Sequence, residues 1–186
     1  MYLAGIKDLF NGELVGYAMN ERMTVKLVMQ ALFCATASKH PEKGLIAHSD
    51  RGSQYCAHDY QKLLKQFGLV TSMSRKGDCY DNAPMESFWG ILKTELVHHR
   101  RFKTRQQAIQ EITEYIEIFY NRQRKQERLG YLSPAKFTQQ YYANLSLLKP
   151  LDSIFDSTYQ FGAEKDNKKP AEAGYRPINI RNISGR

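Results

Sequence analysis

One short stretch anchors the interpretation of this chain: residues 48–55 read His-Ser-Asp-Arg-Gly-Ser-Gln-Tyr. It closes a short apolar run typical of a buried strand, so Asp50 is expected at a strand end. Glu86 lies 36 positions later, after the cap residue Asn82 and the first-turn residue Pro84, and is expected at a helix start. Two such carboxylates can hold the hard divalent cations that phosphoryl transfer uses. Taken singly, however, Asp50 fits a turn or cap, and Glu86 fits a solvated residue favoured by the helix dipole.

The segments around these carboxylates alternate between strand and helix patterns. Residues 2–10 and 13–19 are β-rich and are joined by Asn11-Gly12, a pair that suits a two-residue hairpin turn. Apolar spacing predicts further helices and strands. The expected helices span residues 24–38, 60–67, 104–120 and a short run after Ser133-Pro134, with strands at 44–49 and 69–73 and a loop at 74–81. This order predicts an α/β fold.

The helix expected after Asn82 has a defined buried side. Its stripe of apolar residues consists of Met85, Trp89, Leu92 and Leu96. Trp89 is therefore better explained as a core residue than as a platform for stacking bases. Glu86 and Lys93 fall together roughly 90° from that stripe, at the border between core and solvent. A carboxylate at this border can face a cleft.

Composition limits the classes of function. The 186 residues are 42% apolar and 25% charged, as in one soluble globular domain, and the net charge of +8 favours a polyanionic partner. A basic balance can also serve only solubility. The separated cysteines Cys34, Cys56 and Cys79 indicate neither a disulfide framework nor a zinc site, and His98-His99 has no companion ligand at zinc-binding spacing. We find no signal peptide or membrane span and expect a cytoplasmic protein.

Several blocks of sequence, in a constant order, resemble the catalytic core of insertion-sequence transposases. The blocks are residues 2–10, 48–55, 81–88, 93–96, 120–124 and 129–134. The resemblance covers residues 1–142 and is to the second-reading-frame product (OrfB type) of the large insertion-sequence family three. Its core is of the retroviral-integrase kind. The resemblance implies a ribonuclease-H-like mixed sheet flanked by helices, followed by C-terminal helices.

The resemblance assigns roles to the two carboxylates. Asp50 and Glu86 match the second and third members of an Asp-Asp-Glu triad that binds Mg²⁺ or Mn²⁺. The family carries its first Asp on a strand upstream of the block at which this chain begins, and Asp8 fits a turn residue of the next strand instead. We therefore expect an N-terminally truncated core whose first strand is missing, with unpaired backbone on the neighbouring strands and no catalysis.

The resemblance also implies DNA, both element ends and target, as the partner. Basic candidates for backbone contacts are Lys93, Arg100, Arg101, Lys103, Arg122 and Arg124. Each can also be an ordinary solvated side chain. Gln126 stands where many relatives have His, so the resemblance assigns it no role. The alternative function is a non-catalytic nucleic-acid-binding or interaction protein that interferes with intact transposase, as a homo-oligomer or in association with it near the bacterial nucleoid.

The last part of the chain has a different character. Residues 143–186 lack the resemblance, and after about residue 149 the sequence has little to bury. We expect this second region to be largely disordered. Ile178, Ile180 and Ile183 are spaced to allow a weak strand.

Overall fold

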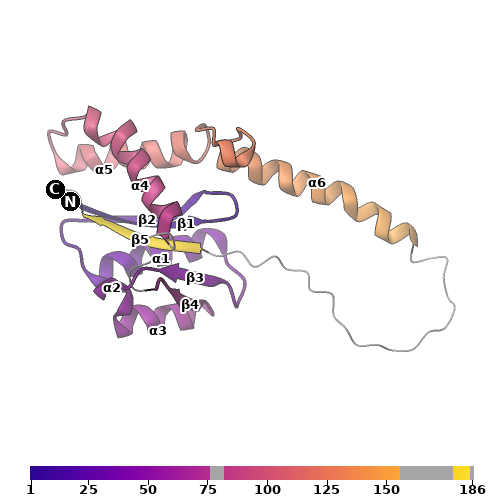
Figure 1. Ribbon diagram of the computed structural model, residues 1–186, viewed down its shortest axis with the longest axis horizontal. Helices are drawn as coiled ribbons and strands as arrows, with labels where there is room; N and C mark the ends of the chain where they lie inside the picture. Colours follow the sequence, from indigo (N-terminus) through magenta and orange to yellow (C-terminus); the bar gives the residue numbers. More distant parts are fainter. Residues whose placement is uncertain (76–81, 156–177, 185–186) are drawn as a thin grey trace.

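A five-stranded mixed sheet forms the centre of the computed structural model, which describes residues 1–75, 82–155 and 178–184 (Figure 1). The strand order is β2-β1-β5-β3-β4. The strands are β1 (Tyr2–Asp8), β2 (Leu14–Asn20), β3 (Ile46–Ser49), β4 (Val70–Met73) and β5 (Ile178–Ser184). β1 and β2 are antiparallel, whereas β3 and β4 are parallel. The predicted α/β architecture with a mixed sheet is confirmed.

Helices cover both faces of this sheet (Figure 1). The helical elements of the described residues are α1 (Val25–Lys39), α2 (Ser53–Cys56), α3 (His58–Gln66), α4 (Ala83–Glu95), the 3₁₀ turns η2 (Val97–His99) and η4 (Glu127–Leu129), α5 (Arg105–Glu114), the π-helical η3 (Tyr115–Tyr120) and α6 (Pro134–Phe155). The long helix expected at 104–120 is present as α5 followed by η3, and the Thr104 hydroxyl caps it by accepting a hydrogen bond from Gln107 N. Residues 76–81 of the expected loop lie outside the described residues.

Alternation along β1 separates two hydrophobic cores. Ala4 and Ile6 pack with α1 and α3 on one face, and Leu3 packs with α4 and η3 on the other. Gly16 on β2 lets the sheet approach α1 closely, because a Cβ there would lie 2.5 Å from Ala35 N. The two faces of the sheet therefore carry different layers, and α4 with Glu86 belongs to the second.

The β1–β2 connection differs from the predicted turn. The strands end at Asp8 and resume at Leu14, so a two-residue Asn11-Gly12 turn is wrong. Asp8 Oδ1 accepts a hydrogen bond from Phe10 N (2.8 Å), the turn role expected of this residue. Asn11 is buried and donates to Thr138 Oγ1 (2.8 Å) of α6. A contact with a distant helix thus fixes a loop that local propensity alone would have made tighter.

The centre of the sheet holds the main departure from expectation. β5 lies between β1 and β3, antiparallel to β1 from Tyr2↔Ser184 to Asp8↔Ile178 and parallel to β3. The unpaired backbone predicted for the neighbours of a missing strand is therefore not found, because β5 takes their hydrogen bonds. The strand suggested by the isoleucine spacing is confirmed. Residues 143–155 continue α6, and residues 156–177 lie outside the described residues.

α6 extends away from the sheet (Figure 1). Its first turns are anchored, since the Phe10 ring packs edge-on against Phe137 and Tyr141. Further along, Tyr142 and Leu147 are exposed. None of the helices in the described ranges has the length and apolarity needed to span a bilayer.

Candidate functional site

Asp50 lies directly after β3 and is half-buried. Its Oδ1 accepts a hydrogen bond from Gly52 N at 2.8 Å, which forms the turn that leads into α2. The turn role that a single strand-end aspartate suggests is thus present. One carboxylate can stabilise a turn and bind a metal ion at the same time, because each of its oxygens accepts more than one contact.

A hydrogen-bond network ties the end of β3 to the start of α4. His48 contacts Ser72 Oγ through Nδ1 (2.9 Å) and Ser74 Oγ through Nε2 (3.2 Å). Asn82, at the α4 cap, donates to Ser74 Oγ at 2.6 Å. Arg51 Nε also donates to the Ser74 carbonyl, at 2.8 Å. Ser74 thus joins the segments that carry the two candidate carboxylates.

Glu86 lies in the first turn of α4 and is exposed. The opposite side of the helix is in the core through Met85, Trp89 and Leu92, as the wheel predicts, and also through Phe88. The aromatic ring of Phe88 packs edge-on against Tyr120, with centroids 4.7 Å apart. Burial of one side therefore fixes the rotation of α4 and directs Glu86 to solvent.

Lys7 is a buried cation beneath the start of α4. Its Nζ donates to the Pro84 carbonyl at 3.1 Å and lies 5.9 Å from the centroid of the Tyr120 ring. Burial, with the nearby charges of Arg128 and Arg124, lowers the pKa of Lys7 to about 7. The sequence did not predict that Lys7 is buried. The alternating positions along β1 give no sign that a lysine lies in the protein interior. Lys7 links β1 to the turn that presents Glu86.

Replacing Lys7 by methionine is expected to remove a rise of stability with pH. The unfolded lysine keeps its proton up to its ordinary pKa of 10.5, whereas the folded one loses it near 7. Between these values the unfolded state binds more protons, so stability rises with pH by up to about 1.4 kcal/mol per unit. Urea titrations from pH 7 to 9 should show the rise in the native chain and in a Lys65→Met control, but not in Lys7→Met. A rise of equal size in Lys7→Met would contradict this assignment.

The six basic candidates are not equivalent. Arg101, Lys103 and Arg122 are exposed, and Lys93 is half-buried on α4. Arg100 forms an ion pair with Glu111 (Nε–Oε2 3.4 Å). All six come from the layer of α4, η2, α5 and the segment after η3, on one side of the sheet. The exposed members are the ones available to a phosphate backbone.

Arg124 is held by an acidic partner. Its guanidinium binds Glu95 with Nη2–Oε1 at 2.7 Å and Nε–Oε1 at 2.9 Å, and Tyr115 donates to Glu95 Oε2 at 2.6 Å. Burial alone would raise the pKa of Glu95, but the hydrogen bonds from Arg124 and Tyr115 outweigh it and lower that pKa. The arrangement favours a role for Arg124 in joining α4 to η3.

The described donor set does not complete the Mg²⁺ or Mn²⁺ site that the resemblance to insertion-sequence transposases implies. Among the described residues, no group of three or more His, Cys, Asp or Glu side chains is placed to share an ion. β5, which lies beside β3, contributes no carboxylate, since its sequence is Ile-Asn-Ile-Arg-Asn-Ile-Ser. Asp50 and Glu86 therefore stand as two candidate ligands without a third in the part of the chain that the structure describes.

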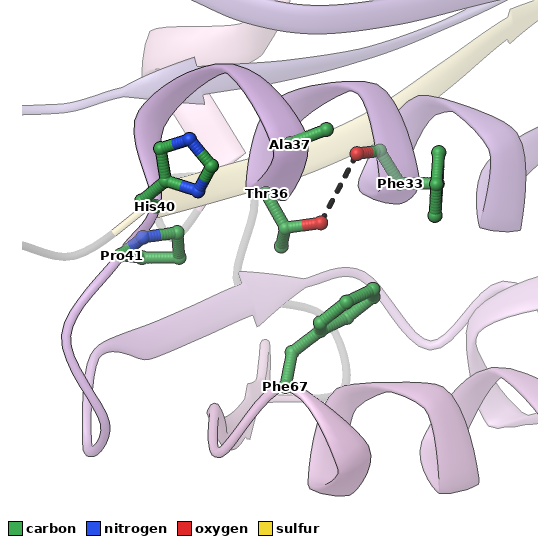
Figure 2. Close-up of a pocket in the computed structure, with 6 residues that line it drawn as sticks. All are labelled: Phe33, Thr36, Ala37, His40, Pro41 and Phe67. Carbon is green, nitrogen blue, oxygen red and sulfur yellow. Dashed lines mark hydrogen bonds between the residues drawn. The ribbon is translucent and has the colours of Figure 1, made fainter.

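A separate hollow of about 350 Å³ lies where α1 and α3 end (Figure 2). It is lined by Phe33, Thr36, Ala37, His40, Pro41 and Phe67. The Thr36 hydroxyl that borders it donates to the Phe33 carbonyl within α1 (3.1 Å). The lining contains no carboxylate and belongs to the layer opposite α4, so this hollow is not the candidate site.

Comparison with known proteins shows which class of protein this chain resembles. Two models described as "Integrase core domain" match residues 1–79 and 86–142. The simian T-cell lymphotropic virus intasome, in complex with PP2A regulatory subunit B56 gamma, contains a chain that aligns with a TM-score of 0.52 at 18% identity, covering 63% of this chain and 43% of that one. That likeness shows the fold alone. The chain is thus similar to the integrase core domain over residues 1–79 and 86–142.

The similar curated proteins are products of insertion sequences. A 31 kDa protein of insertion element IS600 from Shigella sonnei is 63% identical over 142 residues, covering 76% of this chain and 52% of that protein. The IS904 transposase of Lactococcus lactis is 48% identical (74% and 54% covered). The InsF transposase of IS3A from Escherichia coli is 43% identical (74% and 48%). The expected resemblance to insertion-sequence transposases is confirmed, and the chain spans about half the length of these relatives.

Proposed function

We propose that this chain is a DNA-binding core protein of insertion-sequence transposition that holds DNA without cutting it. The observation that carries the proposal is the meeting of the β3 end and the α4 start at Ser74, with Asp50 and Glu86 on the joined segments. In the enzyme class, water or a DNA 3′-hydroxyl attacks a phosphodiester in line at such a site. The partner we propose is DNA in the bacterial cytoplasm.

The proposed absence of cutting follows from the donor set. In-line transfer through two divalent cations needs carboxylates enough to hold both ions. The described residues supply Asp50 and Glu86, and β5 adds none. The phosphate backbone of DNA can be bound electrostatically by exposed basic residues of this chain, namely Arg101, Lys103 and Arg122.

A gel-shift titration tests the binding proposal directly. The full chain is mixed with a duplex that carries an element end, and with an unrelated duplex of equal length, at several salt concentrations. We expect retardation of both duplexes that weakens steeply with salt, because phosphate contacts release counterions. No retardation at low salt would overturn the proposal.

A second candidate function is association with intact transposase. The observation that favours it is α6, which extends from the sheet with Leu147 73% exposed and Tyr142 47% exposed. Exposed apolar residues on one helix are typical of a protein contact. Co-purification of the chain with an intact insertion-sequence transposase, compared with Tyr142→Ser/Leu147→Ser, tests it. Equal recovery of both forms would contradict a role for α6.

A further inference from the structure

β5 brings a particular residue next to the candidate site. In the antiparallel ladder Arg181 pairs with Gly5, and in the parallel ladder Ile180 pairs with Ser49. Asp50 directly follows Ser49, as Arg181 directly follows Ile180, so positions 50 and 181 come at the same level of adjacent strands. The centre of the sheet therefore sets residue 181 beside the strand end that carries Asp50.

The face of the sheet on which position 181 lies can be assigned from its partner. Directly opposed positions in an antiparallel ladder share one face. Gly5 faces α4, because a Cβ at Gly5 would lie 3.0 Å from the Trp89 ring. Position 181 thus belongs to the face that α4 covers. This is the helix that carries Glu86 three residues before Trp89.

We propose that β5 is a substitute central strand, and that position 181, level with Asp50 on the sheet face that α4 covers, carries an arginine where a carboxylate would give the candidate metal site a third ligand. β5 lies outside the stretches that match the integrase core models, which end at residue 142. The chain completes its sheet from its C-terminal end. β5 fills the place between β1 and β3, and its sequence adds no carboxylate to the site. An arginine side chain supplies no oxygen ligand for a hard cation. This deepens the proposed non-catalytic core, and its tests do not depend on DNA.

The direct test is Mn²⁺ binding by isothermal titration calorimetry to the full chain. We expect no saturable binding to the native chain at millimolar Mn²⁺ and saturable binding to Arg181→Asp, at least about tenfold tighter, because ligand charge sets affinity for hard cations. Asn182→Asp adds a carboxylate one position along, level with Ala4 on the other face, and should bind no better than the native chain. Arg181→Asp/Asp50→Asn should lose the gain. Equal binding by the native chain, or an equal gain in Asn182→Asp, would overturn the proposal.

A disulfide test checks the strand placement even if Arg181→Asp folds poorly. In a background with Cys34, Cys56 and Cys79 replaced by serine, the register partners Tyr2 and Ser184 are changed to cysteine. Opposed positions bring their Cβ atoms within reach of a disulfide. We expect an intrachain disulfide in Tyr2→Cys/Ser184→Cys but not in Tyr2→Cys/Ile183→Cys, whose second cysteine is on the opposite face. Equal crosslinking of both pairs, or none in either, would overturn the place of β5. Failure here with intact DNA retardation would leave the binding proposal standing.

Discussion

Changing Arg101 and Lys103 together to glutamate is expected to weaken DNA binding by roughly tenfold to a hundredfold at physiological salt. Both side chains are exposed in the connection from η2 to α5, beside the layer that carries Glu86. Arg100 and Arg124, by contrast, are paired with Glu111 and Glu95. Each lost phosphate contact also removes a released counterion, so the slope of log affinity against log salt should fall by about two.

Fluorescence anisotropy with a labelled duplex, repeated across salt concentrations, measures both quantities. The matched control is Lys62→Glu/Lys65→Glu, which makes the same charge change at exposed positions of α3. α3 covers the sheet face opposite α4. The control should lower affinity much less, by long-range repulsion alone. An equal loss in the two double variants would mean that binding follows net charge and has no preferred face.

Replacing Trp89 by alanine is expected to lower the free energy of unfolding by about 3–5 kcal/mol, enough to unfold much of a marginally stable domain. Trp89 is 4% exposed, packs against Phe88 with the ring centroids 4.8 Å apart and the planes tilted by 59°, and fills the space left by Gly5. Removing the ring leaves a cavity between α4 and the sheet. Trp89→Phe should cost less, because the indole Nε1 is buried without a hydrogen-bond partner among the described residues.

Urea unfolding followed by circular dichroism measures this loss. The control is Phe33→Ala on α1, where the ring is 59% exposed, with an expected cost of about 1 kcal/mol or less. If Trp89→Ala and Phe33→Ala destabilised the chain equally, α4 would not be packed on the sheet through Trp89. The placement of Glu86 would then lose its basis.

Local patterns were sufficient for much of the fold. Helical spacing identified α1, the buried stripe of α4 and the long helix of α5 and η3, because each depends on residues three or four positions apart. Alternation identified β1 and β2. Asp50 at a strand end and Glu86 at a helix start also followed from neighbours in sequence. The sequence therefore predicted in which element each candidate ligand lies, but not how the two segments are joined in space.

Features that depend on distant residues were not predictable. The contact of Asn11 with Thr138 joins positions 127 residues apart, and it accompanies a longer loop than Asn11-Gly12 suggested. The network through His48, Ser74 and Asn82 joins three segments, and no spacing rule indicates it. The isoleucines of β5 suggested a strand but not its neighbours. An alternating pattern predicts that a segment is a strand, but it does not say with which other strands that segment pairs.

The most direct test of the central claim is a cleavage and joining assay on a labelled element-end duplex with Mg²⁺ or Mn²⁺. Intact insertion-sequence transposase serves as the positive control, and Asp50→Asn as the matched variant. We expect the chain to retard the duplex in a gel shift. It should produce no more nicked or joined DNA than the Asp50→Asn variant does. Metal-dependent products at a rate comparable with the intact transposase, abolished in Asp50→Asn, would contradict a DNA-holding core that does not cut.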